Sequence, residues 1–147
     1  MELAIRPATA ADVPLLAAMN RQLCDDERSR NRTSVAELAV RMENWLAGDW
    51  RAVLFDGPTQ AVGYAVYRLG RDDYDPAISE IFVRQFFIQR DLRGRGLGRR
   101  AFALLTTTTF PPGSQIHLEV LATNPQGQRF WESLGFQLYS AALRLTP

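Results

Sequence analysis

The chain has 147 residues, of which 46% are apolar and 22% charged, and its formal net charge is +1. This length predicts one domain, 1–147, with a core of its own, and the composition is typical of a folded globular protein rather than a disordered one. All 17 basic residues are arginine. Because lysine is absent, Schiff-base enzymes, P-loop nucleotide hydrolases and protein kinases are excluded.

Strands and helices are predicted to alternate along the chain from hydrophobic spacing and turn residues. The expected elements, in chain order, are strand 3–6, helix 13–23, a polar loop 25–33, helix 34–47, strands 52–55, 62–69 and 78–89, a helix continuing through 101–106, strand 116–121, helix 126–134, and a final strand or strand pair 136–145. No repeat or linker divides them. This order predicts one mixed α/β domain, antiparallel early and with a strand–helix–strand unit late.

Single copies of two metal-binding residue types limit the chemistry. Cys24 is the only cysteine and His117 the only histidine, so we expect no intramolecular disulfide and no usual metal site; both are interpreted as packed residues. No apolar run reaches the ~18 residues that a membrane span needs, and the first residues lack the basic-then-apolar order of a signal peptide. We therefore expect a cytoplasmic protein without a membrane partner.

A loop rich in glycine and arginine lies between a predicted strand and a predicted helix, with the sequence Arg93-Gly94-Arg95-Gly96-Leu97-Gly98. Glycine permits positive φ and close approach of a ligand to the backbone. The first turn of a helix offers unpaired N–H groups at its positive dipole end. Residues 90–100 carry five arginines and one aspartate, a net charge of +4. The loop is therefore predicted to hold a phosphate, with a simple turn as the alternative.

Other anion-binding motifs fit this loop less well. The dinucleotide-binding fingerprint is not met, because Arg99 stands where its third glycine belongs, and a P-loop is excluded by the missing lysine. A basic nucleic-acid-binding module remains an alternative, but no aromatic residues alternate with the arginines to stack on bases. We therefore expect no nucleic-acid partner.

Two motifs resemble the GNAT N-acetyltransferase family. Arg93, Gly96 and Gly98 match the family's R-x-x-G-x-G acyl-CoA signature, after a long apolar strand and at the start of a helix. Further along the chain, NPQGQRFWESLGF at 124–136 is similar to the family's N-x-x-A-x-x-F-Y-x-x-x-G-F stretch. The order of the predicted elements agrees over essentially the whole chain.

The resemblance implies a three-layer α/β (mixed α+β) fold, with a central, mostly antiparallel, twisted sheet of about six to seven strands, about four flanking helices and a splayed acyl-CoA cleft. It implies acetyl-CoA as co-substrate, and no metal, between the strand ending near Ile88 and the strand starting near Ile116. The resemblance implies that the backbone of Phe86, Phe87 and Ile88 would bind the pantetheine arm. The pyrophosphate would be held by the backbone amides beside Arg93, which are those of Gly94, Arg95, Gly96, Leu97, Gly98 and Arg99. Asn124 and Phe130 would contact the far side of the arm.

Two positions depart from the family pattern. Trp131 stands where many members have a tyrosine that protonates the departing thiolate, and indole cannot do this. A free thiol has a pKa of about 8.5, so the thiolate can leave unaided at modest cost; Tyr139 is the nearest candidate acid in sequence. Gly127 replaces an alanine and is expected to loosen its short helix.

The predicted reaction is direct acetyl transfer from the thioester to a primary amine of a small molecule or peptide. A non-catalytic acyl-CoA-binding regulatory module is the alternative. Glu80 lies in an apolar strand, where a carboxylate is costly unless paired or functional. The resemblance implies a general base there, and an ion pair with Arg84 is the alternative. Residues 72–80 carry four acids and no base, which suits either a cationic acceptor or a solvated turn. A homodimer is one option for the assembly.

Overall fold

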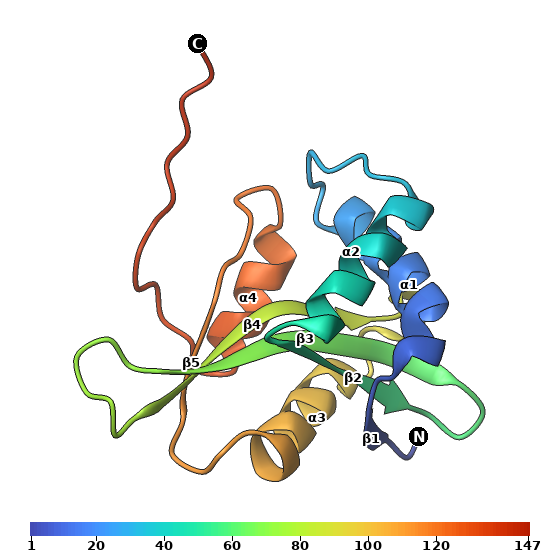
Figure 1. Ribbon diagram of the computed structural model, residues 1–147, viewed down its shortest axis with the longest axis horizontal. Helices are drawn as coiled ribbons and strands as arrows, with labels where there is room; N and C mark the ends of the chain where they lie inside the picture. The colour runs from blue at the N-terminus through green and yellow to red at the C-terminus, as the bar shows by residue number, and fades with distance from the viewer.

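A five-stranded sheet forms the centre of the structure, with its strands in sequence order, β1-β2-β3-β4-β5 (Figure 1). The computed structural model describes all residues, 1–147. Neighbouring strands from β1 to β4 are antiparallel, and β5 is parallel to β4. The strand bounds are β1 Ala4–Pro7, β2 Trp50–Asp56, β3 Ala61–Arg71, β4 Ser79–Ile88 and β5 Gln115–Leu118. The predicted mixed, mostly antiparallel architecture is confirmed.

Four α-helices flank the sheet, as predicted: α1 Val13–Asp26, α2 Val35–Ala47, α3 Leu97–Leu104 and α4 Pro125–Ser133. Local sequence sets their ends. In α2, for example, the Ser34 hydroxyl accepts a hydrogen bond from the Glu37 N–H at 3.2 Å, and Gly48 follows the last turn. The threonine run after α3 extends it by a π-helical turn, Leu105–Thr109. No helix is long and apolar enough to cross a membrane.

Two hydrophobic cores lie on opposite faces of the sheet. Alternate residues of one strand serve different cores: Val53 and Phe55 pack with α3, whereas Ala52 and Leu54 pack with α1 and α2. Residues from α4 pack at the margin of the α3 core. Because both faces are covered, the central strands are apolar throughout rather than alternating.

The expected final strand at 136–145 is wrong, and the sheet has five strands rather than six or seven. Figure 1 shows the chain running as an extended segment from the end of α4 away from the body of the domain. Residues 137–147 take part in no backbone hydrogen bond. Their sequence suits a strand, but a strand forms only where a sheet edge pairs with it.

Candidate functional site

A gap opens between β4 and β5. Only Glu80–Val83 of β4 pairs with Gln115–Leu118 of β5. Beyond Val83, the remainder of β4 has β3 alone as a neighbour. A β-bulge places Arg84 as an extra residue at the point of separation, since Val66 pairs with Gln85 but Tyr67 pairs with Val83. The outer edge of β4 is therefore open along the residues predicted to bind the pantetheine arm, Phe86, Phe87 and Ile88.

The glycine-rich loop joins the end of β4 to α3 and presents a row of free N–H groups. Gly94 and Gly96 adopt φ of +77° and +75°, and Gly96 is the N-cap of α3. None of the amides of residues 94–99 donates a hydrogen bond within the protein. Six consecutive free donors at the positive end of a helix dipole can accommodate an anion of pyrophosphate size.

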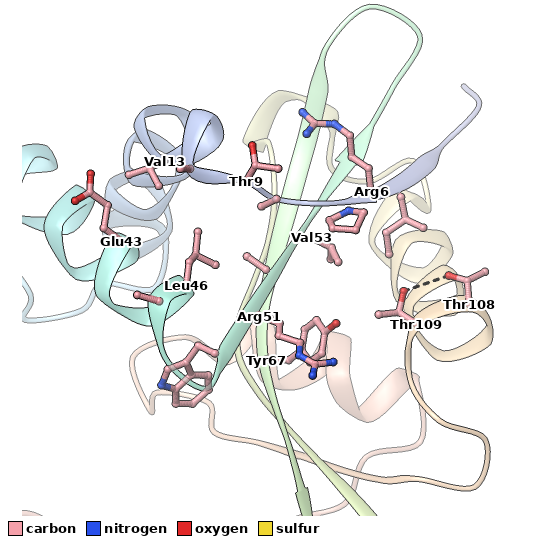
Figure 2. A pocket seen from close by; sticks show the side chains of 17 residues that line it. Arg6, Thr9, Val13, Glu43, Leu46, Arg51, Val53, Tyr67, Thr108 and Thr109 are labelled. Carbon is pink, nitrogen blue, oxygen red and sulfur yellow. Dashed lines mark hydrogen bonds between the residues drawn. The ribbon is translucent and has the colours of Figure 1, made fainter.

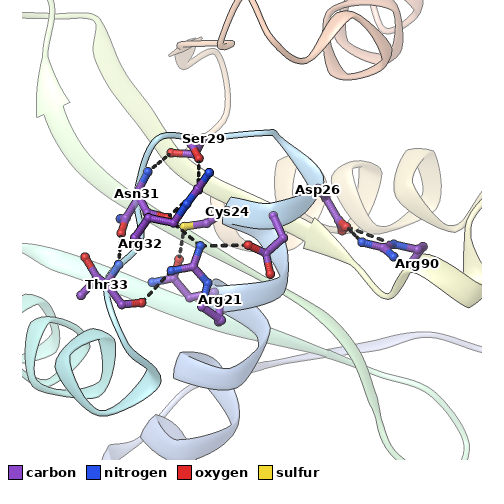
Figure 3. Close-up of polar contacts among 10 residues, drawn as sticks. Arg21, Cys24, Asp26, Ser29, Asn31, Arg32, Thr33 and Arg90 are labelled. Carbon is purple, nitrogen blue, oxygen red and sulfur yellow. Dashed lines mark hydrogen bonds and ion pairs between the residues drawn. The ribbon is translucent and has the colours of Figure 1, made fainter.

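Asp26, at the end of α1, pairs with Arg90 (Figure 3) and with Arg93. Its carboxylate accepts hydrogen bonds from Arg90 and from Arg93, the latter at 2.6 Å. Arg93 also donates through Nε to the Ile88 carbonyl at 2.9 Å, which fixes the loop against the end of β4. The contact of Asp26 with these arginines was not predicted from the sequence, because Asp26 lies more than sixty residues before them and no local pattern joins them.

Arg99 and Arg100 also contact protein groups. Arg99 donates to the carbonyl and hydroxyl of Ser133, and Arg100 donates to the Met1 carbonyl at 2.6 Å. Four of the five loop arginines are thus held by the fold, and only Arg95 makes no hydrogen bond or ion pair.

The second half of α4 lies against the start of α3. A Cβ on Gly98 would lie 3.1 Å from the Phe130 ring, so glycine allows this close approach. Asn124 caps α4 by accepting a hydrogen bond from the Gly127 N–H at 3.0 Å. An alanine at 127 would place its Cβ 2.3 Å from the Asn124 amide nitrogen. Gly127 thus preserves the cap, and the expectation that it loosens the helix stays a prediction.

Trp131 sits inside an aromatic cluster. Its ring centroid lies 4.8 Å from that of Phe130, 5.2 Å from Phe86, and 5.3 Å from both Phe102 and Phe136. These tilted contacts stabilise the packing of α3 and α4 on β4. The indole of Trp131 therefore serves the packing of the domain at this position.

Glu80 and His117 form a pair at the closed end of the gap. Nδ1 of His117 lies 2.8 Å from Oε1 of Glu80, within ion-pair distance, and the alternative pair of Glu80 with Arg84 does not form. Arg84 instead stacks over the ring of Trp45. The imidazole also stacks on Phe82, with centroids 4.7 Å apart, and half of it is exposed. The parallel register of β4 and β5 brings the two residues together, which sequence reasoning did not foresee.

The other predicted site residues lie elsewhere. Tyr139 is 91% exposed on the extended segment 136–147 and makes no hydrogen bond. The Asp72 carboxylate accepts from the N–H groups of Tyr74 and Asp75, as in a self-contained turn. Cys24 is buried, and burial raises the pKa of its thiol, which favours the weakly nucleophilic neutral form.

Glu27 follows α1 and has a carboxylate without a hydrogen bond or ion pair. Its backbone carbonyl accepts from Thr123 Oγ1 at 2.7 Å, which places it between α1 and the loop after β5. Burial, and then the charge of Asp26, raise the pKa of Glu27 above its ordinary value. A partly buried, unpaired carboxyl beside the gap is suited to contact a cationic group.

Because ionised Glu27 destabilises the folded chain, replacing it with a neutral glutamine should raise stability in a pH-dependent way. The pKa of Glu27 is higher in the folded than in the unfolded chain, so stability is lost as the pH rises through the folded value. Glu27→Gln should therefore raise the Tm at pH 7 by roughly 2 °C, and the gain should vanish below about pH 4. Thermal unfolding followed across this pH range measures it. The exposed Glu43→Gln is the control, and an unchanged Tm for Glu27→Gln at pH 7 would contradict the prediction.

A separate cavity of about 880 Å³ opens where β1, β2 and the end of α2 meet (Figure 2). Its lining includes Arg6, Glu43, Trp50, Arg51 and Tyr67. It contains none of the residues predicted for cofactor binding or catalysis. No three His, Cys, Asp or Glu side chains are grouped so that they could hold a metal ion.

Several solved structures share this fold, whereas no curated protein matches the sequence significantly. They include a possible acetyltransferase from Clostridium difficile 630 (14% identity, TM-score 0.80, covering 100% of this chain and 98% of that one). The aminoglycoside N-acetyltransferase AAC(6')-Iy in complex with CoA is also similar (15% identity, TM-score 0.76, covering 99% of this chain and 95% of that one). A predicted acetyltransferase with acetyl-CoA from Clostridium acetobutylicum is similar as well (17% identity, TM-score 0.74, covering 99% of this chain and 96% of that one).

These identities show a shared fold and no more. A family model described as the acetyltransferase (GNAT) family matches residues 17–136, which include both motifs and both strands of the gap. The chain therefore belongs to the GNAT acetyltransferase family.

Proposed function

We propose that this chain is a cytoplasmic, acetyl-CoA-dependent N-acetyltransferase that acetylates a primary amine of a small molecule or peptide directly from the thioester. The observation that carries the proposal is the row of free amides at 94–99, beside the open edge of β4. A pyrophosphate joined to an extended, amide-containing arm complements both features, because the anion fits the helix start and the arm can add to the strand. Two solved structures with this fold contain CoA or acetyl-CoA.

The residues present fit such a substrate. The position of a Cβ on Gly94 or Gly96 has no atom within 4 Å, so the space over the amides is open. Arg93 and Arg95 supply positive charge beside it. We assign the backbone of Phe86, Phe87 and Ile88 to the pantetheine arm. We assign the backbone amides of six consecutive residues to the pyrophosphate: Gly94, Arg95, Gly96, Leu97, Gly98 and Arg99. Asn124 and Phe130 are assigned to the far side of the arm.

The reaction requires a neutral amine. The amine nitrogen attacks the thioester carbonyl, the C–S bond breaks, CoA leaves as a thiolate, and the ammonium proton passes to a base. We assign this base to the pair of Glu80 and His117. Because Nδ1 of His117 lies 2.8 Å from Oε1 of Glu80, the carboxylate can hold a proton on that nitrogen and leave the lone pair of Nε2 to accept one.

Substitution of this pair tests the assignment. Release of free CoA is first measured with a panel of amines, and Glu80→Gln and His117→Gln are then assayed on any acceptor found. Each should lower kcat/KM by about 10²-fold or more, with the KM for acetyl-CoA unchanged. The exposed Glu119→Gln, just beyond β5, should behave as wild type. A loss with Glu80→Gln alone would assign the base to Glu80 itself, and full activity of both variants would refute the pair.

The acid for the leaving thiolate is a separate question. Tyr139 is the candidate from the sequence, yet it contacts neither wall of the gap in this structure. The assignment stays a prediction, and Tyr139→Phe in the same assay tests it. Unchanged kcat would show that the thiolate leaves without this phenol.

A non-catalytic acyl-CoA-binding module is the second candidate. It is favoured by Trp131, which packs among aromatic rings where a proton donor would be expected. Saturable acetyl-CoA binding without CoA release across a broad amine panel would support this module over the enzyme.

A further inference from the structure

Arg41, Arg68 and Arg84, here called the arginine cluster, gather on the face of the sheet that α1 and α2 cover. The guanidinium carbons of Arg41 and Arg84 lie 4.3 and 4.7 Å from the ring centroid of Trp45. That of Arg68 lies 4.5 Å from the ring centroid of Trp50. None of the three guanidinium groups has a hydrogen-bond or ion-pair partner in the chain. Each therefore keeps its N–H donors for another group.

The arginine cluster is costly to the fold as it stands. Burial, and then the positive charge of Arg84, lower the pKa of Arg41. Nε of Arg41 is buried and makes no hydrogen bond. A buried donor without a partner destabilises a fold, and so do like charges held close together. An anion bound between these guanidinium groups would offset both costs.

A second donor without a partner lies in α1 on the same face. The Asn20 side chain is fully buried, and its oxygen accepts a hydrogen bond from Nε2 of Gln85 at 3.0 Å. Gln85 in turn accepts from the Tyr64 hydroxyl at 2.8 Å. These bonds leave Nδ2 of Asn20 unpaired. Burial raises the pKa of Tyr64 and the charge of Arg41 opposes that rise, so the guanidinium lies near this network. Both orphaned groups are donors, which suits a ligand with acceptor oxygens.

Strand register places the arginine cluster beside the pair of Glu80 and His117. Trp50, Arg68, Phe82 and His117 lie opposite one another on β2, β3, β4 and β5, in one row across the sheet. Residues opposite each other on neighbouring strands share a face, and the imidazole stacks on Phe82. Adjacent strands are about 4.8 Å apart, so the backbones of Arg68 and His117 are separated by about 10 Å. This spacing suits a small molecule that has an anionic group at one end and an amine at the other.

We propose that the acceptor is a small amine carrying a carboxylate or a phosphate, which the arginine cluster binds while the amine lies at the pair of Glu80 and His117. The proposal rests on the proposed N-acetyltransferase function. A planar guanidinium binds two oxygens of one carboxylate or phosphate, and stacking on Trp45 and Trp50 holds the guanidinium groups in place. A polycation would instead meet three positive charges.

Matched amines test the charge of the acceptor. Release of CoA is measured with β-alanine against β-alaninamide, with phosphoethanolamine against ethanolamine, and with spermidine as a polycation. The acidic member of at least one pair should have a kcat/KM about 10- to 100-fold above that of its neutral partner, as hydrogen bonds to a charged group contribute. The pair that responds distinguishes carboxylate from phosphate. Acetylation of only the neutral amines or spermidine would overturn the anionic acceptor and leave the proposed function standing.

Substitution of two exposed arginines tests the assigned residues. Arg68→Gln/Arg84→Gln should remove the preference for the acidic amine, with the KM for that amine rising about 10-fold or more. The matched control is Arg51→Gln/Arg129→Gln. It removes two exposed arginines outside the cluster, one of them on the opposite face of β2, and should keep the wild-type preference. A preference that survives Arg68→Gln/Arg84→Gln would overturn the assignment.

A binding measurement separates this proposal from the enzymatic function. Titration calorimetry follows β-alanine and phosphoethanolamine binding to the full chain in millimolar CoA, which has no acetyl group to transfer. Binding that Arg68→Gln/Arg84→Gln abolishes, without CoA release from acetyl-CoA for any amine, would support the anion site and reject the enzyme. Absence of both binding and an acidic preference in the wild type would overturn the anion site.

Discussion

Acetyl-CoA should protect the wild-type chain against thermal unfolding, and the double variant Arg93→Ala/Gly96→Ala should lose almost all of that protection. At a ligand concentration of about 100 times Kd, binding stabilises the folded state by about 2.7 kcal/mol, or roughly 5–10 °C in Tm for a chain of this size. The variant removes one guanidinium, which contacts Ile88 and Asp26. It also forces a side chain into the left-handed conformation that Gly96 adopts at the start of α3. An affinity about 100-fold weaker would leave a shift of roughly 1 °C.

A matched double variant separates ligand binding from backbone strain. Gly113 has φ of +76°, against +75° at Gly96, and a methyl group added at either glycine would have no atom within 4 Å. Gly113→Ala/Arg129→Ala therefore imposes the same strain and removes one arginine outside the loop. It should keep the full acetyl-CoA shift. Equal protection of both double variants, or no shift of the wild type at millimolar acetyl-CoA, would reject the assigned pyrophosphate site.

Gly63→Ala should be the most destabilising glycine-to-alanine substitution in the sheet. The new Cβ would lie 2.0 Å from the Phe87 carbonyl oxygen and 3.0 Å from Ile88 Cδ1. Since the first of these atoms is backbone, β3 and β4 must move apart there. The hydrogen bond from Gln89 N–H to the Val62 carbonyl, 2.8 Å long, would weaken as well. Overpacking of this kind costs about 3 kcal/mol, so we expect Tm to fall by roughly 6–12 °C.

Gly70 provides the control on the same strand. Its Cβ would lie 3.8 Å from the Glu80 carbonyl oxygen, an ordinary contact. Urea and thermal unfolding of Gly70→Ala should stay within about 1 kcal/mol of wild type. If Gly63→Ala and Gly70→Ala were equally stable, the close approach of the two strands at Gly63 would be refuted. Because Gly63 pairs with Ile88, the variant should also weaken acetyl-CoA binding.

The backbone conformation of the glycine-rich loop was predictable from sequence because its determinants are local. Glycines at 94 and 96 set the left-handed backbone, and the helix that follows leaves its first amides unpaired. The four helices were predictable for a similar reason, since caps and apolar spacing act within a few residues. Both kinds of feature depend on neighbours along the chain, and both agree with the structure.

Contacts between distant segments were decided only by the tertiary structure. Asp26 meets Arg90 and Arg93 because the end of α1 lies beside the end of β4, and Glu80 meets His117 because two strands pair in one particular register. No pattern of spacing encodes either meeting.

The expected last strand shows the same division. Alternating residues in 136–145 determined that this segment can be a strand, which is a property of the chain itself. Pairing requires the backbone groups of a second edge, and only the three-dimensional arrangement shows which edges are free. Sequence alone thus determined the four helices and the conformation of the glycine-rich loop in this acetyltransferase-family chain. Tertiary structure decided which charged groups meet and left both residues 137–147 and the outer edge of β5 unpaired.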